Sequence, residues 1–282
     1  MIEHRTYGGV RPPTTVLAKG RAATHAASWL IGERDDPVSE ADAVGTSGYG
    51  SRAARWFRTL AWHWIAIVAV SISALVLFAL VGEDVFNHEA GGVDDAVRAW
   101  VLAHQTPKGY AAFVFITRAG SSIPMILLAI GVGVWLWHTV HRRIAGVVVT
   151  APAVATGVFN GVKAIFHRAR PAGAGKLKIL TYAFPSGHAT TSTAVLLTLT
   201  YVLARERLIP AWLALLVGVA GPFLVGASRV YLDVHWATDV FGGWALGVFV
   251  AALSAALYER VRARVLRPSD PRTALPLGDS PG

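Results

Sequence analysis

Long apolar segments recur along this chain and constrain its fold more than any other feature. A helix needs about 20 apolar residues to cross a hydrocarbon layer roughly 30 Å thick. Because 54% of the residues are hydrophobic and ten are Trp, the composition also points away from a soluble enzyme. We therefore expect an all-α fold, a polytopic membrane bundle of six transmembrane helices. The expected spans run from Thr59 to Val81, Ile123 to Val140, Ile144 to Phe166, His188 to Ala204, Ala211 to Ala227 and Asp239 to Tyr258.

The pattern divides the chain into three regions. Residues 1–58 mix Gly, Pro, Ser, Thr and charges of both signs without a long apolar run, so we expect a largely disordered cytoplasmic tail. Residues 59–258 form the expected membrane domain, and residues 259–282 a cytoplasmic C-terminal tail rich in Pro and Gly. The segment from Val93 to His104 has apolar residues at helical spacing but is too short to span. It predicts an amphipathic helix lying on the membrane surface.

Lys and Arg in short loops predict the orientation in a cell membrane, either the inner or the plasma membrane. Four basic groups flank the expected spans on one side, which we assign to the cytoplasm. The net charge of +9 does not indicate nucleic acid binding, because these residues flank apolar runs instead of forming a stripe on a polar domain. The four groups are Arg52, Arg55 and Arg58; Arg142 and Arg143; Arg205 and Arg207; and Arg260, Arg262, Arg264 and Arg267.

The connection between the third and fourth expected spans breaks this charge rule. It lies on the external side in the six-span topology, yet it is strongly basic. Charge placed against the topological preference needs another purpose, and binding an anion supplies one. Its basic residues are Lys163, Arg168, Arg170, Lys176 and Lys178.

Two of these cations mark the outer end of the third expected span. Lys163 lies near that end, and Arg170 with Pro171 follows seven residues later, where the proline disfavours further helix. An anion could be held between the two cations. A snorkelling Lys and an ordinary interfacial Arg explain the same pair without a ligand.

The sequence Pro185-Ser186-Gly187-His188 opens the fourth expected span. Ser186 can cap the helix, and Gly187 lets the backbone come close to a ligand. The free N–H groups and the helix dipole attract negative charge, which outlines a phosphate site. A plain N-cap followed by an interfacial His is the structural alternative.

A third cluster runs from Ser228 to Asp239 and contains Arg229. His235 and Asp239 are four residues apart, so on a helix they share a face and the carboxylate can bond one imidazole nitrogen. This bond fixes the tautomer and leaves the other nitrogen free as a nucleophile or base. A His–Asp pair that only stabilises a helix start fits the same spacing.

The topology derived from charge places all three clusters on the external face, which favours one shared site over three unrelated features. Lys163, Arg170 and Arg229 suit the oxygens of a phosphoryl group, because they stabilise the charge that builds in the transition state. Two His and an Asp could instead ligate zinc. Because the three cations would repel a dication, we expect no metal and no cofactor.

The two histidines need different roles in such a site. With Asp239 behind it, His235 is the better candidate for in-line attack on phosphorus, which gives a phosphohistidine intermediate. His188 would protonate the leaving oxygen and later activate water.

These three clusters resemble the signature motifs of the type 2 phosphatidic acid phosphatase family, which are K-x6-R-P, P-S-G-H and S-R-x5-H-x3-D. Every signature position is filled, and the resemblance covers roughly residues 120–258. In this chain the motifs read KAIFHRARP from Lys163 to Pro171, PSGH from Pro185 to His188, and SRVYLDVHWATD from Ser228 to Asp239.

The resemblance implies an all-helical core of six spans and metal-independent dephosphorylation of a membrane lipid phosphate. The topology derived from charge places this site on the external, periplasmic or extracellular, face. It implies His235 as nucleophile, His188 as acid and base, and Asp239 as the group that orients His235. Bacterial members of similar build act on phosphatidic acid, phosphatidylglycerol phosphate or polyprenyl diphosphates such as undecaprenyl diphosphate. The phosphate contacts that the resemblance implies are Lys163, Arg170, Ser186, Gly187 and Arg229.

Two other functions fit parts of the pattern. A phosphotransferase would use the same site, with a lipid or sugar hydroxyl in place of water. A transporter would explain ionisable residues at membrane depth, but the spans lack the paired, broken-helix repeats of many transporters. Arg168, Lys176 and Lys178 could contact a second phosphate, which would favour a diphosphate substrate, or could meet anionic headgroups instead.

Overall fold

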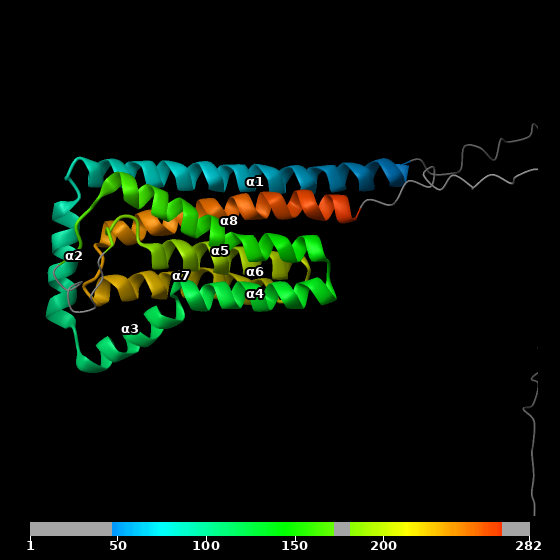
Figure 1. Ribbon diagram of the computed structural model, residues 1–282. Helices are drawn as coiled ribbons and strands as arrows, with labels where there is room; N and C mark the ends of the chain where they lie inside the picture. The colour runs from blue at the N-terminus through cyan, green and yellow to red at the C-terminus, as the bar shows by residue number, and fades with distance from the viewer. Residues whose placement is uncertain (1–46, 172–180, 267–282) are drawn as a thin grey trace, which may run out of the picture. The chain divides into compact units, whose positions relative to one another are not determined.

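The computed structural model describes residues 47–171 and 181–266, and within these ranges the chain is helical throughout its regular structure. The all-α fold is therefore confirmed (Figure 1). Residues 51–282 form one compact unit, and the arrangement below refers to it. Its helices are α1 (Ser47–Phe86), α2 (Gly91–His104), α3 (Pro107–Ala119), α4 (Ser122–Thr139), α5 (Arg142–Phe166), α6 (Gly187–Arg205), α7 (Ala211–Tyr231) and α8 (Ala237–Val265).

Five helices in the described part of the chain are long and apolar enough to cross a membrane. The helix expected from His188 is present as α6, but it is not one of the five, so the predicted number of six spans is not confirmed. The candidate spans are Trp62–Phe86, Ser122–Thr139, Arg142–Phe166, Ala211–Tyr231 and Ala237–Val265.

Helix α6 is less apolar because it is rich in threonine and lies inside the bundle, where it packs against α4, α5, α7 and α8. The hydroxyls of Thr190, Thr193 and Thr200 donate to backbone carbonyls one turn earlier, at 2.7 to 3.0 Å. Such bonds satisfy the hydroxyl donors without a second polar partner. A helix of moderate hydropathy can therefore occupy the centre of an otherwise apolar bundle.

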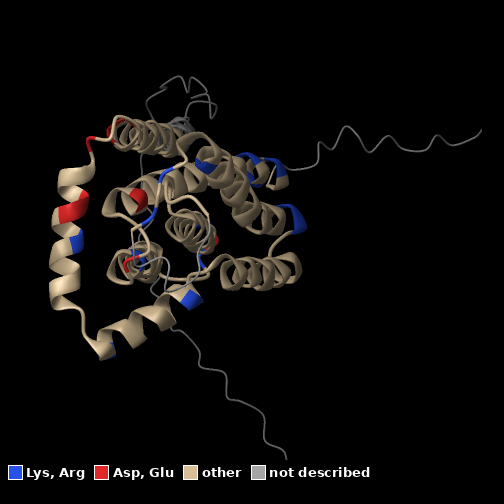
Figure 2. Cartoon of the chain, turned by 60° about the vertical axis from the view of Figure 1, so that its left-hand side comes forward, with Lys and Arg blue, Asp and Glu red and all other residues tan. Residues whose placement is uncertain are grey.

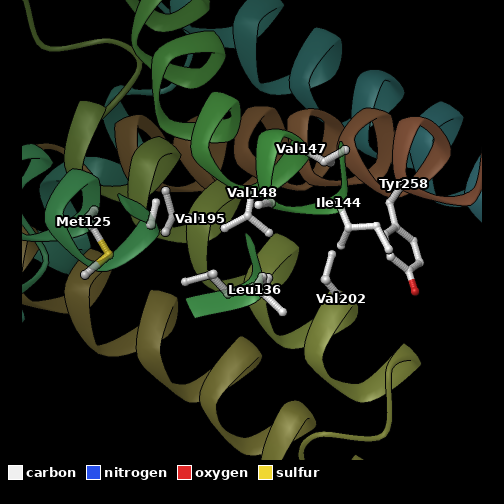
Figure 3. Close-up of a cluster of buried hydrophobic side chains, with 11 residues drawn as sticks. Met125, Leu136, Ile144, Val147, Val148, Val195, Val202 and Tyr258 are labelled. Atoms are coloured by element: carbon white, nitrogen blue, oxygen red, sulfur yellow. The ribbon is translucent and has the colours of Figure 1, made fainter. Parts of the chain in front are cut away.

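The largest apolar core holds α4, α5, α6 and α8 together (Figure 3). It runs along the length of α4, the first turns of α5, and the middle and end of α6. Branched aliphatic side chains fill most of it, and the Tyr258 ring from α8 closes one side (Figure 3). Its larger buried members are Met125, Leu136, Ile144, Val147, Val148, Val195, Leu199, Val202 and Tyr258.

Helices α6 and α8 touch through two glycines one turn apart on α8. A Cβ atom added at Gly243 would lie 2.8 Å from the carbonyl oxygen of Ser186, and one at Gly247 would lie 2.5 Å from the Thr193 Cβ. Real Cβ atoms do not approach this closely, so only glycine permits the contact. The close approach lets the Ser186 N–H donate to the Asp239 carbonyl oxygen at 2.9 Å, which joins the start of α6 to the start of α8.

Ion pairs join the same two helices at the opposite end of the bundle. Arg205 on α6 binds Glu259 on α8 at 2.7 and 3.0 Å, and the Tyr201 hydroxyl donates to the same carboxylate at 2.8 Å. Arg262 on α8 reaches Glu206, just beyond α6, at 3.1 Å. The arginine groups predicted to face the cytoplasm after α6 and in α8 therefore lie together, away from the start of α6.

The predicted amphipathic segment from Val93 to His104 is confirmed as a helix, α2, which crosses one end of the bundle (Figure 1). Its inner side buries Asp94 and Val101, while Val93 and Trp100 are 59% and 62% exposed. Acidic and basic positions lie next to each other along this helix (Figure 2). Helix α3, which follows it, was not predicted.

The borders of the terminal regions differ from those expected. Helix α1 begins at Ser47, inside the segment expected to be a tail, and α8 continues to Val265 instead of ending near Tyr258. Residues 1–46 and 267–282, the remainder of the two predicted tails, lie outside the described residues.

Candidate active site

The three predicted clusters meet at one end of the bundle. Arg170, which follows α5, contacts His235 in the loop between α7 and α8. Ser186, which precedes α6, is bonded to Asp239 on the first turn of α8. Residues far apart in the sequence therefore contribute to a single site, because α5 and α7 end where α6 and α8 begin.

His235 and Asp239 form a direct pair. The imidazole Nδ1 lies 3.2 Å from Asp239 Oδ2, and the Trp236 N–H donates to the same oxygen at 2.9 Å. The predicted bond is therefore present, but the predicted reason for it is wrong. Helix α8 starts only at Ala237, so His235 lies in the loop before it and the Asp239 side chain reaches back over the helix start.

The contacts of His235 define its tautomer. Arg170 Nη1 lies 2.8 Å from the imidazole Nε2, and a guanidinium can only donate. Nε2 therefore accepts, and Nδ1 carries the proton that it donates to Asp239. Burial lowers the pKa of His235 well below its usual value, and the nearby cations Arg170, Arg229 and Lys163 lower it further. The imidazole is thus neutral, with a lone pair on Nε2.

Arg170 is fixed by the backbone around it. Its Nε donates to the Thr181 carbonyl at 2.6 Å and its Nη1 to the Val234 carbonyl at 2.7 Å, while its Nη2 reaches the Tyr182 carbonyl at 3.1 Å. Burial lowers the pKa of Arg170, an effect that the Asp239 carboxylate opposes. These contacts place the guanidinium beside His235 Nε2.

Lys163, at the last turn of α5, is buried and turned toward the same segment. Its ammonium donates to the carbonyl oxygens of Tyr182 and, at 3.2 Å, Ala183. Both of these partners are neutral carbonyl oxygens, so they do not neutralise the charge of an ammonium. The predicted cation pair of Lys163 and Arg170 thus adjoins the segment that leads into Ser186.

Arg229 and Ser186 bring unsatisfied polar atoms to this region. Arg229 is 4% exposed, and its Nη1 donates to the Thr117 hydroxyl of α3 at 2.7 Å. Among the described residues, its Nε and the Ser186 hydroxyl have no hydrogen-bond partner although both are buried. A buried polar atom left without a partner costs about 1 to 3 kcal/mol, which a polar ligand would relieve.

The start of α6 differs in detail from the prediction. Ser186 is the N-cap residue, but its side chain makes no capping hydrogen bond. A Cβ atom at Gly187 would lie 3.0 Å from the Phe159 ring, so packing against α5 already requires a small residue there. His188, on the first turn of α6, is partly buried and interacts electrostatically with Arg229 and His235.

Arg168 does not have either of the roles considered for it. Its Nη1 lies 2.7 Å from Asp239 Oδ1 and its Nη2 lies 2.6 Å from Asp94 Oδ2. With both ends of the guanidinium in ion pairs, Arg168 is not available to a second phosphate or a headgroup. Lys176 and Lys178 lie outside the described residues.

Four residues of this region were missed from the sequence: Asp94, Thr117, Arg168 as a partner of Asp239, and Thr238. The only sequence signal for any of these residues was an acidic residue, Asp94, in an amphipathic helix.

Among the described residues, no three His, Cys, Asp or Glu side chains converge as a metal site would need. The site instead joins a neutral imidazole to several buried cations, a combination that suits the chemistry of a phosphoryl group.

Known proteins resemble this chain over most of its helical part. The family model described as the PAP2 superfamily matches residues 143–263, which include all three clusters. This match confirms the resemblance inferred from the motifs.

Two relatives and one solved structure illustrate this similarity. Phosphatidylglycerophosphatase B of Bacillus subtilis is 26% identical over 68% of this chain and 96% of its own length. An undecaprenyl-diphosphatase of Sulfolobus acidocaldarius is 43% identical, but over only 26% of this chain and 32% of its own length. The crystal structure of a transmembrane PAP2 type phosphatidylglycerolphosphate phosphatase from Bacillus subtilis superposes with a TM-score of 0.60 and 24% identity. It covers 68% of this chain and 96% of that structure, and the likeness shows a shared fold.

Proposed function

Because the PAP2 superfamily model matches residues 143–263 of this chain, we propose that it is an integral membrane lipid phosphatase that works through a phosphohistidine. The observation that carries the proposal is the pairing of a neutral His235 with Asp239 on one nitrogen and Arg170 on the other. This arrangement leaves one lone pair for attack and places a cation where the charged oxygens of a phosphoryl group would lie.

The first chemical step is attack of His235 Nε2 on phosphorus. The N–P bond forms while the P–O bond to the leaving group breaks, and His188 gives its proton to the departing oxygen. Because Arg170 Nη1 rests on Nε2 before substrate binds, attack requires the guanidinium to exchange this contact for one with a phosphoryl oxygen. Asp239 stabilises the positive charge that the imidazole gains.

The second step returns the enzyme to its starting state. His188 removes a proton from a water molecule, which attacks phosphorus as the P–N bond breaks and the electron pair returns to Nε2. Lys163, Arg170 and Arg229 stabilise the oxygens in both steps. The unpartnered Ser186 hydroxyl and Arg229 Nε are the polar atoms that a phosphoryl oxygen would satisfy. In this proposal no step needs a metal ion.

A lipid phosphate is the proposed substrate class, because the site lies at the end of helices long and apolar enough to cross a membrane. A headgroup could enter the site while its tails stay in hydrocarbon. The relatives are named for phosphatidylglycerophosphate and for undecaprenyl diphosphate. The ion pairs of Arg168 remove one argument for a diphosphate, so both substrates belong in the test.

The proposal is tested by phosphate release from phosphatidylglycerol phosphate and undecaprenyl diphosphate in one detergent, with purified wild type and His235→Ala. Wild type should release orthophosphate from at least one lipid, and the variant from neither. Release by the variant at the wild-type rate would exclude His235 as nucleophile. Transfer of the phosphoryl group to an added hydroxyl acceptor, without release of orthophosphate, would identify a phosphotransferase instead.

We also propose that the site faces the external side of the cell membrane. The chain contains no Cys, so a single introduced thiol reports its own location. Lys108→Cys, exposed on α3 near the site, should react with a membrane-impermeant maleimide on intact cells. Arg207→Cys, exposed after α6 at the other end, should react only after permeabilisation. The reverse pattern would place the site on the cytoplasmic side.

A further inference from the structure

Asp94 is a buried carboxylate on α2, outside the three motifs. It is 2% exposed. Its Oδ2 lies 2.6 Å from Arg168 Nη2 and accepts from the Thr238 hydroxyl at 2.7 Å, while its Oδ1 accepts from the Thr238 N–H at 3.0 Å. A carboxylate is rarely buried so deeply unless it is paired. These contacts join α2 to the first turn of α8.

Arg168 carries the connection from Asp94 to the nucleophile. Its Nη1 donates to Asp239 Oδ1 and to the Thr238 hydroxyl, each at 2.7 Å. Asp239 is completely buried, and its other oxygen faces His235 Nδ1. Direct contacts therefore run from Asp94 through Arg168 and Asp239 to His235.

The signs of the charges along this series of contacts, from Asp94 to His235, matter for the chemistry. An isolated pair of Arg168 and Asp239 would be neutral overall, so it would stabilise an imidazolium poorly. Because Asp94 supplies a second negative charge, the three groups together carry one net negative charge beside His235. That charge compensates the positive charge that the imidazole gains when it attacks phosphorus.

A second ion pair from α2 holds the other side of His235. Arg98, one turn after Asp94, binds Asp233 through both carboxylate oxygens at 2.7 and 3.0 Å. Asp233 lies two residues before His235 and has a positive φ of 54°, a conformation that is uncommon outside glycine. The inner side of α2 therefore contacts the chain on both sides of the nucleophile.

We propose that Asp94 and Arg168 are positioning residues that fix Asp239, and through it the orientation and charge compensation of His235. This proposal rests on the proposed phosphatase function. Neither residue touches the substrate. Their loss should therefore slow the chemical step and leave substrate binding nearly unchanged, as removal of outer-shell partners does at other sites.

The first test compares Asp94→Asn with Asp95→Asn. Asp95 is the next residue on α2 and is exposed, so the control makes the same charge change without touching Arg168. Asp94→Asn should lower kcat about 10-fold to 100-fold with KM nearly unchanged, and Asp95→Asn should change neither. Arg168→Lys should retain more activity than Arg168→Gln, because it keeps the charge. Wild-type kcat in Asp94→Asn would overturn the proposal.

The second test needs no turnover, so it separates this proposal from the proposed function. In ¹⁵N-histidine NMR of the detergent-solubilised full chain, wild-type His235 should show a downfield proton on Nδ1, and His235→Ala assigns the signal. In Asp94→Asn that proton should move upfield, because Arg168 then draws Asp239 away from the imidazole. An unchanged signal would overturn the positioning role. A wild type that releases no phosphate would defeat the proposed function alone.

Discussion

Arg170 Nη1 lies 2.8 Å from His235 Nε2, the nitrogen proposed to attack phosphorus. Asp239 Oδ2 lies 3.2 Å from the opposite nitrogen of the same ring. The two contacts select a neutral imidazole whose lone pair is covered by a cation. In the proposed mechanism, substrate competes with the imidazole for Arg170, so this arginine both binds phosphate and covers Nε2 before substrate arrives.

Replacement of Arg170 by Ala should mainly weaken the interaction with phosphoryl oxygens. A hydrogen bond to a charged group contributes about 1.5 to 3 kcal/mol, which corresponds to roughly a 10-fold to 150-fold loss in kcat/KM. Inhibition by inorganic phosphate should weaken in parallel. Arg143→Ala, an exposed arginine at the start of α5, is the control and should leave both quantities unchanged. Unaltered phosphate inhibition in Arg170→Ala would contradict the assigned contact.

The pH dependence of kcat/KM should reflect the environment of His235. Burial and three nearby cations lower the pKa of this imidazole well below its usual value near 6.5. A lowered pKa keeps the imidazole neutral as the pH falls through 6.5, so activity should persist there and decline only at lower pH. Because kcat/KM reports groups of the free enzyme, its acid limb should lie below pH 6.5. A limb at or above that pH, assigned to His235, would contradict the structure.

Removal of metal ions should not affect turnover. The site pairs two histidines and one aspartate with three cations, a poor environment for a dication. Purified protein dialysed against a strong chelator should keep its rate of phosphate release, measured against an undialysed sample. A loss of activity that added zinc or magnesium restores would contradict metal-independent catalysis.

The contact between α6 and α8 should be sensitive to a single methyl group. At Gly247 a Cβ atom would meet the Thr193 side chain at 2.5 Å and the Thr190 carbonyl oxygen at 2.7 Å. Gly247→Ala should therefore destabilise the protein by about 1 to 3 kcal/mol through overpacking, seen as a lower melting temperature in detergent. Gly131→Ala on α4, where the added Cβ meets nothing within 4 Å beyond its chain neighbours and its own helix backbone, should not. Equal melting temperatures would contradict the close approach of α6 to α8.

Local patterns in the sequence predict the helices and the chemical groups of the site well. The length of the apolar segments locates α4, α5 and α7 closely. A helix in lipid must form its own backbone hydrogen bonds and cover its backbone with apolar side chains. Charge predicts that residues around Lys163, His188 and His235 share one face. The hydropathy of α6 is only moderate, because the helix is rich in threonine; three of these threonines bond to their own helix backbone and lie among protein neighbours.

Contacts between distant segments could not be predicted from the sequence. The partners of Asp94 follow it by 74 and 144 positions, and no local pattern links an interfacial helix to a catalytic loop. For the same reason Arg168 was considered a phosphate ligand, although it forms a buried ion pair. The His235–Asp239 bond was predicted from helical spacing, yet it forms across a helix start because the Asp239 side chain caps the Trp236 N–H.

The most direct test of the account is to identify the residue that carries the phosphoryl group during turnover. Wild-type protein and a His188→Ala variant are mixed with ³²P-labelled lipid phosphate and quenched in base, and the labelled peptide is mapped by mass spectrometry. The account predicts an acid-labile, base-stable label on His235; in His188→Ala both its formation and its hydrolysis should be slower, because His188 serves as acid in the first step and as base in the second. A label on any other residue, or phosphate release by His235→Asn at the wild-type rate, would contradict it.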